Sequence, residues 1–183
     1  MRRRCGVPPL NSTVSFRPDP MRIRTARIEE AADLRTMIME AVLPHKDEDF
    51  SDEGWLRFQE PNTIPLITDR LLDARVLTLV CEMEGALVGI ITVKDHAKID
   101  QLFVIPRYRR QGVAKALWEE ALRLCKTHHG ASQFSVLSST MGVPMYRAFG
   151  FHLVGPKQTV KGITFYPMAW PTQSEANISL ERQ

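Results

Sequence analysis

Hydrophobic positions recur along this chain with two different spacings, and each spacing predicts a type of secondary structure. Early in the chain, four apolar residues share one face of a helix that ends before Pro44: Ala31, Leu34, Ile38 and Ala41. Farther on, segments 76–82 and 86–94 are rich in Val, Ile, Leu and Thr, and Glu84 and Gly85 supply a turn between them. The pattern therefore predicts a helix followed by a β-hairpin.

The rest of the chain alternates between strand and helix patterns. Strands are predicted at residues 21–27, 97–105, 133–137, 151–160 and 163–170. Helices are predicted at residues 64–72, 112–126 and 143–149, and the second of these has an apolar arc wide enough to lie flat on a sheet. Residues 45–62 are acidic and aromatic, and we expect a loop with a helical turn there.

This order of elements predicts an α/β (α+β) fold. Antiparallel hairpins lie early and late in the chain, and one strand–helix–strand unit lies between them. Because a helical crossover usually joins parallel strands, segments 97–105 and 133–137 are expected to be parallel neighbours.

Composition narrows the class of protein. The 183 residues suffice for one domain with a core of its own, and 44% of them are apolar. Three cysteines cannot all pair, which favours a reducing compartment and a cytoplasmic location over a secreted disulfide scaffold. Of these cysteines, Cys81 and Cys125 lie in apolar runs and are expected to be buried. The longest apolar runs, such as 86–91, are too short to cross a bilayer.

The net charge of +3 comes from the first 20 residues, which hold four arginines and one aspartate. The chain from Met21 onward has 20 basic and 20 acidic residues, so no general polyanion-binding surface is indicated. Residues 1–20 are a basic arm, a transit peptide or a disordered leader that need not be native, and their prolines favour the leader. We expect one folded domain at 21–170 and a polar tail at 171–183.

The most informative segment runs from Leu102 to Ala114, with the sequence LFVIPRYRRQGVA. A strand ends, a basic turn follows, and a helix begins at Gly112. Backbone N–H groups at such a turn point outward, and the helix dipole adds partial positive charge, so the turn suits phosphate or pyrophosphate. Gly112 lets a ligand approach the backbone, while Arg109 and Arg110 either bind phosphate in bidentate fashion or form a solvated basic turn.

This segment resembles the R/Q-x-x-G-x-G/A signature of the GNAT superfamily of N-acetyltransferases, with Arg109, Gly112 and Ala114 at its fixed positions. Residues 104–109 are similar to the superfamily's run-in to that signature. Residues 143–151 resemble its second signature, in which a tyrosine precedes Gly-Phe by four residues. The likeness covers residues 21–170 and implies a mixed, mostly antiparallel sheet of about six to seven strands, flanked by about four helices and splayed at the cofactor site.

The resemblance implies that acetyl-coenzyme A (acetyl-CoA) binds at this turn. The pyrophosphate would be held by the loop and the start of the helix, at Arg109, Arg110, Gln111, Gly112, Val113, Ala114 and Lys115. The pantetheine arm would pair with the preceding strand at Leu102, Phe103 and Val104, in effect as an added strand. Relatives often have an asparagine before the helix of the second signature. Ser139, between Ser138 and Thr140, either replaces that contact with its hydroxyl or caps the helix.

The resemblance also implies the chemistry, which is direct attack of an amine on the thioester. Tyr146 stands at the superfamily's general-acid position, where its phenol would protonate the leaving thiolate; otherwise it is an aromatic packed beside the cofactor. Lys98 occupies the usual place of the base, which leaves Asp100 either as the base or as an anion that orients the amine. His96 is a further candidate or a surface residue.

In this superfamily the acceptor amine usually enters between the first helices and the loop that joins the last two strands. Here these segments are residues 43–61 and 156–163. The first is acidic and contains Phe50 and Trp55, which suits a cationic amine with an apolar body or else forms a solvated face. Small-molecule amines, antibiotics, polyamines and protein amines all stay open as acceptors.

The leading hypothesis is therefore an acetyl-CoA-dependent N-acetyltransferase that acts on a small-molecule or peptide amine, as a monomer or homodimer. The alternative is a non-catalytic CoA-binding or acyl-CoA-binding sensor or interaction module, which Lys98 permits and Tyr146 argues against. Binding to nucleic acid through Arg2, Arg3 and Arg4 is not expected, nor is a membrane partner. No metal is expected, because His128 and His129 lack the partners of a metal site.

Overall fold

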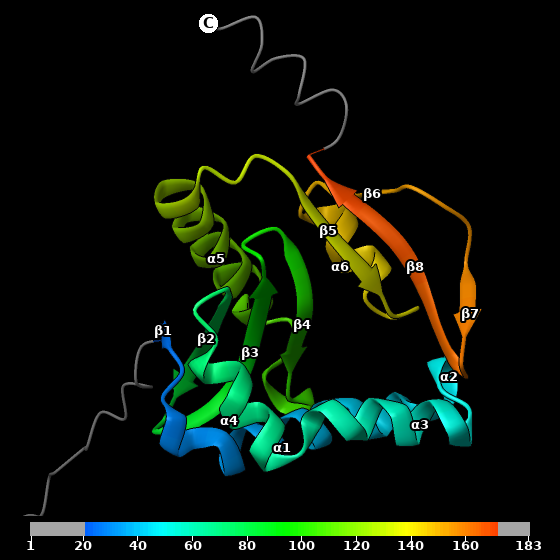
Figure 1. Ribbon diagram of the computed structural model, residues 1–183, viewed down its shortest axis with the longest axis horizontal. Coiled ribbons are helices and arrows are strands. Elements are labelled where there is room, and N and C mark those ends of the chain that lie inside the picture. Colours follow the sequence, from blue (N-terminus) through cyan, green and yellow to red (C-terminus); the bar gives the residue numbers. More distant parts are fainter. Residues whose placement is uncertain (1–20, 172–183) are drawn as a thin grey trace, which may run out of the picture.

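A computed structural model describes residues 21–171 and confirms the mixed architecture (Figure 1). The predicted leader, Cys5 and the tail from residue 172 lie outside the described residues. Within 21–171 the strand order is β1-β2-β3-β4-β5-β8-β6, with β7 paired to β8. The strands are β1 (Arg22–Thr25), β2 (Val76–Met83), β3 (Ala86–Lys94), β4 (Lys98–Val104), β5 (Phe134–Ser138), β6 (His152–Leu153), β7 (Gln158–Val160) and β8 (Ile163–Trp170). The helices are α1 (Ala31–Val42), α2 (Lys46–Asp49), α3 (Asp52–Gln59), α4 (Ile64–Leu72), α5 (Val113–His129) and α6 (Val143–Ala148).

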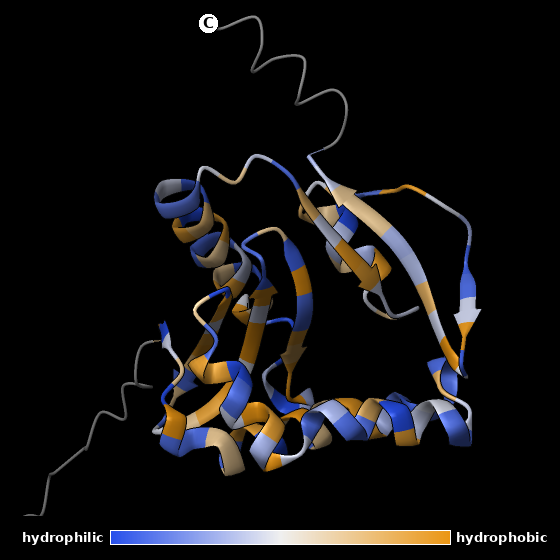
Figure 2. Ribbon diagram, in the orientation of Figure 1, coloured by the Kyte–Doolittle hydropathy of each residue, from blue (hydrophilic) through white to orange (hydrophobic). Residues whose placement is uncertain are grey.

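The central strands β2 and β3 are covered on both faces. Residues 78–81 of β2 and 88–93 of β3 are buried consecutively, although successive side chains of a strand point to opposite faces. Strands of this kind need helices on each side, and α5, α1 and α4 provide them (Figure 1). Figure 2 shows that β2 and β3 consist mostly of apolar residues, whereas β7 is mostly polar. Cys81 and Cys125 are buried free thiols, as predicted, and burial raises the pKa of each to about 11.

The predicted parallel pair is present, but only at one end of its strands. Strands β4 and β5 pair over two positions, Lys98 with Ser135 and Ile99 with Val136. Asp100 forms a β-bulge, because the register of β4 against β3 passes over it. Beyond the bulge, β4 diverges from β5 as far as Val104 (Figure 1), which is the expected splay.

Two expectations from the sequence need correction. The strand predicted at 151–160 is two short strands, β6 and β7, because Gly155 and Pro156 interrupt it and proline has no N–H to donate. The described sheet therefore has eight strands rather than six or seven. Residues 45–62 are not loop with one helical turn but form α2 and α3, since Ser51 Oγ accepts a hydrogen bond of 3.2 Å from Gly54 N at the start of α3. The described helices thus number six rather than about four.

The half of the sheet beyond the splay has its own aromatic core. Trp118 of α5 contacts the rings of Phe134, Phe151 and Trp170 at centroid distances of 5.1 to 5.9 Å. This cluster holds β5, β6 and β8 against α5 while β4 diverges from them. Among the described helices, α5 is the longest, and none is both long and apolar enough to span a membrane.

Candidate active site

The basic turn between β4 and α5 has the geometry of an anion-binding loop. Arg110 and Gly112 have positive φ angles of 61° and 84°. Left-handed residues in a tight turn direct successive backbone N–H groups toward the same side. A Cβ atom built on Gly112 would meet no heavy atom within 4 Å, so the loop is open at that point.

The N–H groups of this loop are free. In the described part of the chain, the backbone N–H groups of residues 110–115 make no hydrogen bond with the protein, and the first bond of α5 runs from Ala116 N to Gly112 O at 2.9 Å. Such unsatisfied donors at a helix N-terminus suit the oxygens of a phosphate or pyrophosphate. The loop therefore fits the pyrophosphate of coenzyme A.

The side chain of Arg109 does not bind in this loop, contrary to the expectation that it grips phosphate. Its guanidinium donates to the carbonyl oxygens of Ala41 and Val104 at 2.7 and 3.1 Å. Its Nη1 also lies 2.7 Å from Nε2 of His45, and burial lowers the pKa of the guanidinium. Arg109 thus joins α1 to the end of β4, and the exposed Arg110 is the arginine left to meet a phosphate.

The other predicted loop residues contribute mainly through their backbone. The side chain of Val113 is buried in the core, and the side-chain amide of Gln111 donates to Arg107 O at 3.0 Å. Lys115 is exposed, with its Nζ 3.7 Å from Glu119, so its charge is at the rim of the loop. Ala114 adds a backbone N–H at the second position of α5.

The predicted pantetheine edge lies on β4 beyond its last pairing with β5. Leu102, Phe103 and Val104 are half-buried there and pair with β3 on their other side. The carbonyl of Val104 already accepts a hydrogen bond from Arg109. The edge open to an added strand is therefore formed mainly by Leu102 and Phe103.

Tyr146 is buried on α6, with 5% of its surface exposed. Its ring meets those of Phe149 and Phe151 at centroid distances of 6.3 and 5.2 Å. Burial raises the pKa of the phenol above its ordinary value of 10, so it stays protonated at neutral pH. No hydrogen bond of the described residues involves this hydroxyl, in contrast to that of Tyr108, which donates to Glu84. The hydroxyl oxygen itself stays accessible, so it is free to donate to a bound ligand.

Of the two candidate bases, Asp100 is engaged in ion pairs, and His96 lies at the end of β4 away from the anion loop. The carboxylate of Asp100 lies 2.9 Å from Lys94 Nζ and 4.0 Å from Arg70 Nη1, so it is held as a counter-ion between two cations. This arrangement favours the orienting role over the base. His96 lies before β4, at the end of the strand opposite the loop, and its ring stacks on that of His129 at 3.3 Å.

The segment before α6 is held by a residue that the sequence did not distinguish. Ser139 Oγ accepts from Gly142 N at 3.1 Å, which closes the turn before α6 and leaves the hydroxyl proton of Ser139 free for another acceptor. Thr140 donates to the Asp49 carboxylate from its N–H at 3.0 Å and from its hydroxyl at 2.5 Å. Asp49 is 4% exposed, although it lies in an acidic run whose composition indicates a solvated face. It ties α2 to the loop that precedes Tyr146.

The two segments predicted to flank the acceptor are in direct contact. Ser51 N donates to Gly162 O at 2.9 Å, and Phe50 forms an isolated β-bridge with Ile163. Four rings then run without a break from the end of α2 to β4: Phe50, Trp55, Phe58 and Phe103. The predicted acceptor side is therefore lined by aromatic rings as well as acids.

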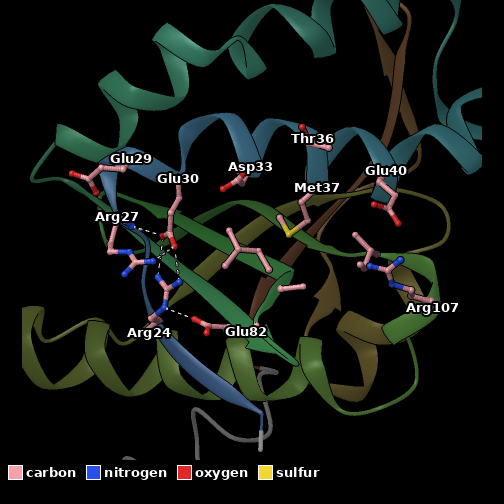
Figure 3. A pocket seen from close by; sticks show the side chains of 14 residues that line it. Arg24, Arg27, Glu29, Glu30, Asp33, Thr36, Met37, Glu40, Glu82 and Arg107 are labelled. Atoms are coloured by element: carbon pink, nitrogen blue, oxygen red, sulfur yellow. Dashed lines mark hydrogen bonds and ion pairs between the residues drawn. The ribbon is translucent and has the colours of Figure 1, made fainter. Parts of the chain in front are cut away.

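A groove of about 740 Å³ lies elsewhere, between α1 and the β2–β3 hairpin (Figure 3). Part of its charge is paired within the protein, since Arg24 lies between Glu30 and Glu82, at 2.6 and 3.0 Å. Residues 109–115, Tyr146 and Asp100 do not line this groove, so it is separate from the candidate active site. The described residues also contain no cluster of three His, Cys, Asp or Glu side chains placed to hold a metal ion.

Comparisons with known proteins identify the family. Residues 46–171 match the family model described as an acetyltransferase (GNAT) domain. The peptidyl-lysine N-acetyltransferase YiaC of Escherichia coli K12 is 28% identical over 110 residues, which are 59% of this chain and 72% of that protein.

Two solved structures are similar to this one. The PaiA N-acetyltransferase from Thermoplasma acidophilum, in complex with coenzyme A, has a TM-score of 0.73 and 18% identity over 84% of this chain and 99% of its own. A GCN5-related N-acetyltransferase from Rhodopseudomonas palustris has a TM-score of 0.72 and 20% identity over 86% and 99%. These likenesses support the fold, while the family model covers most of the chain and both predicted signatures. The chain belongs to the GNAT family of acetyltransferases.

Proposed function

We propose that this protein is an N-acetyltransferase that transfers the acetyl group of acetyl-CoA to a primary amine by direct attack in a ternary complex. The observation that carries the proposal is the row of free N–H groups at residues 110–115, next to the open edge of β4. The coenzyme A complex of the similar PaiA protein supports the cofactor. The name of YiaC, a peptidyl-lysine N-acetyltransferase, supports an amine acceptor.

The residues of the loop and of β4 bind and orient the cofactor. The N–H groups of residues 110–115 and the guanidinium of Arg110 hold the pyrophosphate. The backbone of Leu102 and Phe103 orients the pantetheine arm as an added strand. When bound, acetyl-CoA supplies an acetyl thioester, which an amine attacks without an enzyme nucleophile.

Three protein groups then act on the reacting atoms. A backbone N–H near Phe103 and Val104 donates to the acetyl oxygen as negative charge develops on it. Tyr146 gives its proton to the leaving sulfur, which its unpaired hydroxyl and its protonated state suit. Asp100, as an anion between Lys94 and Arg70, attracts and orients the ammonium. The ammonium loses one proton to water before attack, the N–C bond forms, and the C–S bond breaks. The second proton lost by the nitrogen returns through water to Tyr146, so that one proton is released overall.

The alternative, a binding module without turnover, has one observation in its favour, which is Lys98 at the usual place of the base. Release of free thiol from acetyl-CoA separates the two functions. The panel of acceptors contains hexylamine, spermidine, N-acetyl-lysine methylamide and glucosamine. We expect at least one amine to raise thiol release about tenfold or more above the rate without amine.

Calorimetry with coenzyme A completes the test, because it measures binding without turnover. Tight binding with no turnover of any amine would replace the enzyme by the binding module. Absence of binding would contradict the assignment of the loop itself.

A further inference from the structure

An aromatic wall lines the acceptor side of the fold. It consists of Phe50, Trp55, Phe58 and Phe103, all of them partly exposed. Neighbouring rings lie 5.1 to 6.1 Å apart, and Trp55 and Phe58 are stacked with an angle of 20° between their planes. Partly exposed rings that touch one another present a continuous apolar surface to a ligand.

The wall begins at the position where acyl transfer is proposed. Phe103 lies on the open edge of β4, and its ring meets that of Phe58 edge-on at 6.1 Å. Trp55 and Phe58 come from α3 and Phe50 directly follows α2, and the contact of Ser51 with Gly162 fixes this segment against the β7–β8 turn. A chain lying along the wall would therefore have one end at the reacting centre and the other at the rim of α3.

The charge at that rim is negative. Residues 45–62 contain six carboxylates and two cations, and one of those cations, Arg57, is paired with Glu53. The facing hairpin adds Lys157 and Lys161, of which Lys157 lies over the ring of Tyr166. The excess of negative charge attracts a cation to the side of α2 and α3.

The wall already holds an alkylammonium that belongs to the protein. Lys46 Nζ lies 5.8 Å from the centroid of the Trp55 ring and 3.6 Å from a carboxylate oxygen of Asp52. A ring face and a carboxylate together form a common site for ammonium ions. This internal contact shows the chemistry that the wall accepts, which is a primary ammonium on an unbranched methylene chain.

We infer that the aromatic wall is the acceptor site and that it selects a primary amine carried on an unbranched alkyl chain, such as a lysyl side chain or a linear diamine. This inference rests on the proposed function. The carboxylates at the rim attract the ammonium as it enters, the rings remove the methylene groups from water, and Asp100 orients the ammonium at the reacting centre. A polyhydroxylated amine is disfavoured, because its hydroxyl groups would lose hydrogen bonds to water against the rings.

The first experiment measures binding without turnover. Hexylamine is titrated into the protein while tryptophan fluorescence is followed. Hexanol, which lacks the positive charge, and glucosamine, which lacks the apolar chain, are the controls. We expect hexylamine to change the fluorescence and to bind about tenfold more tightly than either control. The change should vanish in Trp55→Phe, because Trp118 and Trp170 belong to the separate aromatic core.

The second experiment uses the steady-state constants for thiol release. Trp55→Leu is expected to raise KM for hexylamine about tenfold and to leave KM for acetyl-CoA within about twofold. Leu56→Ala is the matched control, since this neighbour on α3 is 67% exposed, and it should change neither constant. Trp55→Phe, which keeps a ring, should restore most of the affinity and shows whether Trp55→Leu merely disturbs folding.

The outcomes separate this inference from the proposed function. Equal use of glucosamine and hexylamine, or a rise in both KM values in Trp55→Leu, would overturn the inference and leave the acetyltransferase in place. Binding of hexylamine at Trp55 without any thiol release would contradict the proposed function and leave the alkylammonium site.

Discussion

Arg109 donates a hydrogen bond of 2.7 Å to the carbonyl oxygen of Ala41, the penultimate residue of α1. The last carbonyls of a helix lack intrahelical partners, so this guanidinium satisfies one of them and joins α1 to β4. Arg109 is the first fixed residue of the family signature, yet its side chain stabilises the fold around the loop. In the function that we propose, contact with a phosphate falls instead to the backbone and to Arg110.

This division of roles predicts opposite effects of two adjacent substitutions. Arg109→Gln leaves the carbonyls of Ala41 and Val104 without their donor, and it should lower the free energy of unfolding by about 2 kcal/mol. Arg110→Gln should change that free energy by less than about 0.5 kcal/mol, because its side chain is exposed, while it raises Kd for coenzyme A about fivefold. Urea unfolding and calorimetry measure the two quantities. If Arg109→Gln raised Kd for coenzyme A and left the free energy of unfolding unchanged, Arg109 and not Arg110 would be the phosphate-binding arginine.

A substitution at Gly112 has two separable effects, one of backbone strain on stability and one on the binding of coenzyme A. Its φ of 84° costs an alanine about 1 kcal/mol, and the new Cβ would project into the open loop. We expect Gly112→Ala to raise Kd for coenzyme A at least about tenfold, since the methyl group separates the ligand from the N–H groups. Gly130→Ala is the control. It has a φ of 62° and equally open surroundings, but lies at the other end of α5. It should show the same loss of stability with unchanged Kd.

The parts of this fold that were predictable from sequence are those set by local pattern. Segments rich in Val, Ile, Leu and Thr indicated β2 and β3, the strand pattern that stops at Pro106 indicated β4, and helical spacing together with Gly112 indicated α5 and the anion loop. The roles of Asp49 and Arg109 were not predictable, because their partners lie 91 and 68 residues away in the sequence. Composition cannot distinguish a buried acid from its solvated neighbours. The rings of Trp55 and Phe58, three positions apart, did carry a helical signal for α3, but eight residues give a weak one.

Tyr146→Phe tests the general acid. The hydroxyl makes no hydrogen bond within residues 21–171, so its loss should not lower the free energy of unfolding. We expect kcat to fall about a hundredfold with KM for acetyl-CoA nearly unchanged. Because burial raises the pKa of this phenol, the wild-type rate should show no decline from Tyr146 as the pH rises toward 10. An unchanged kcat at every pH would end the assignment, and the ring would be an aromatic that only packs.

Glu30 makes stability sensitive to acid. It binds Arg24 at 2.6 Å and accepts from Arg27 N at 2.8 Å (Figure 3), and the hydrogen bond from Arg24 contributes most to lowering the pKa of this carboxyl to about 2. A depressed pKa in the folded state means that the stabilisation is complete above pH 4.5 and is lost as the pH falls toward 2. Glu30→Gln should therefore cost roughly 2 kcal/mol at pH 7 and flatten the decline of Tm between pH 5 and pH 2.

Glu29→Gln is the control for this prediction, since Glu29 is exposed beside Glu30. It should leave both the free energy of unfolding at pH 7 and the acid dependence of Tm almost unchanged. An equal effect of the two substitutions would show that net charge, and not the network around Arg24, determines the acid dependence.

Gly54 provides the last prediction, in which two physical effects have opposite signs. Alanine in place of glycine inside a helix normally raises stability by about 1 kcal/mol, and Gly54 is the third residue of α3. A Cβ at Gly54, however, would overlap the backbone carbonyl of Gly162, which also accepts the hydrogen bond from Ser51. Backbone atoms cannot move aside as a flexible side chain can, so the helix must shift away from the β7–β8 turn. We expect Gly54→Ala to lower the free energy of unfolding by about 2 kcal/mol.

The same shift should reach the acceptor side, because α3 carries Trp55 and Phe58. Gly54→Ala should raise KM for an alkylamine more than KM for acetyl-CoA, whose loop lies at the start of α5. Leu56→Ala is the matched control, since it also places an alanine on α3, at a side chain that is 67% exposed, without adding an atom near Gly162. A stabilised Gly54→Ala with unaltered amine kinetics would mean that helix propensity outweighs the contact and that the turn does not fix the aromatic wall.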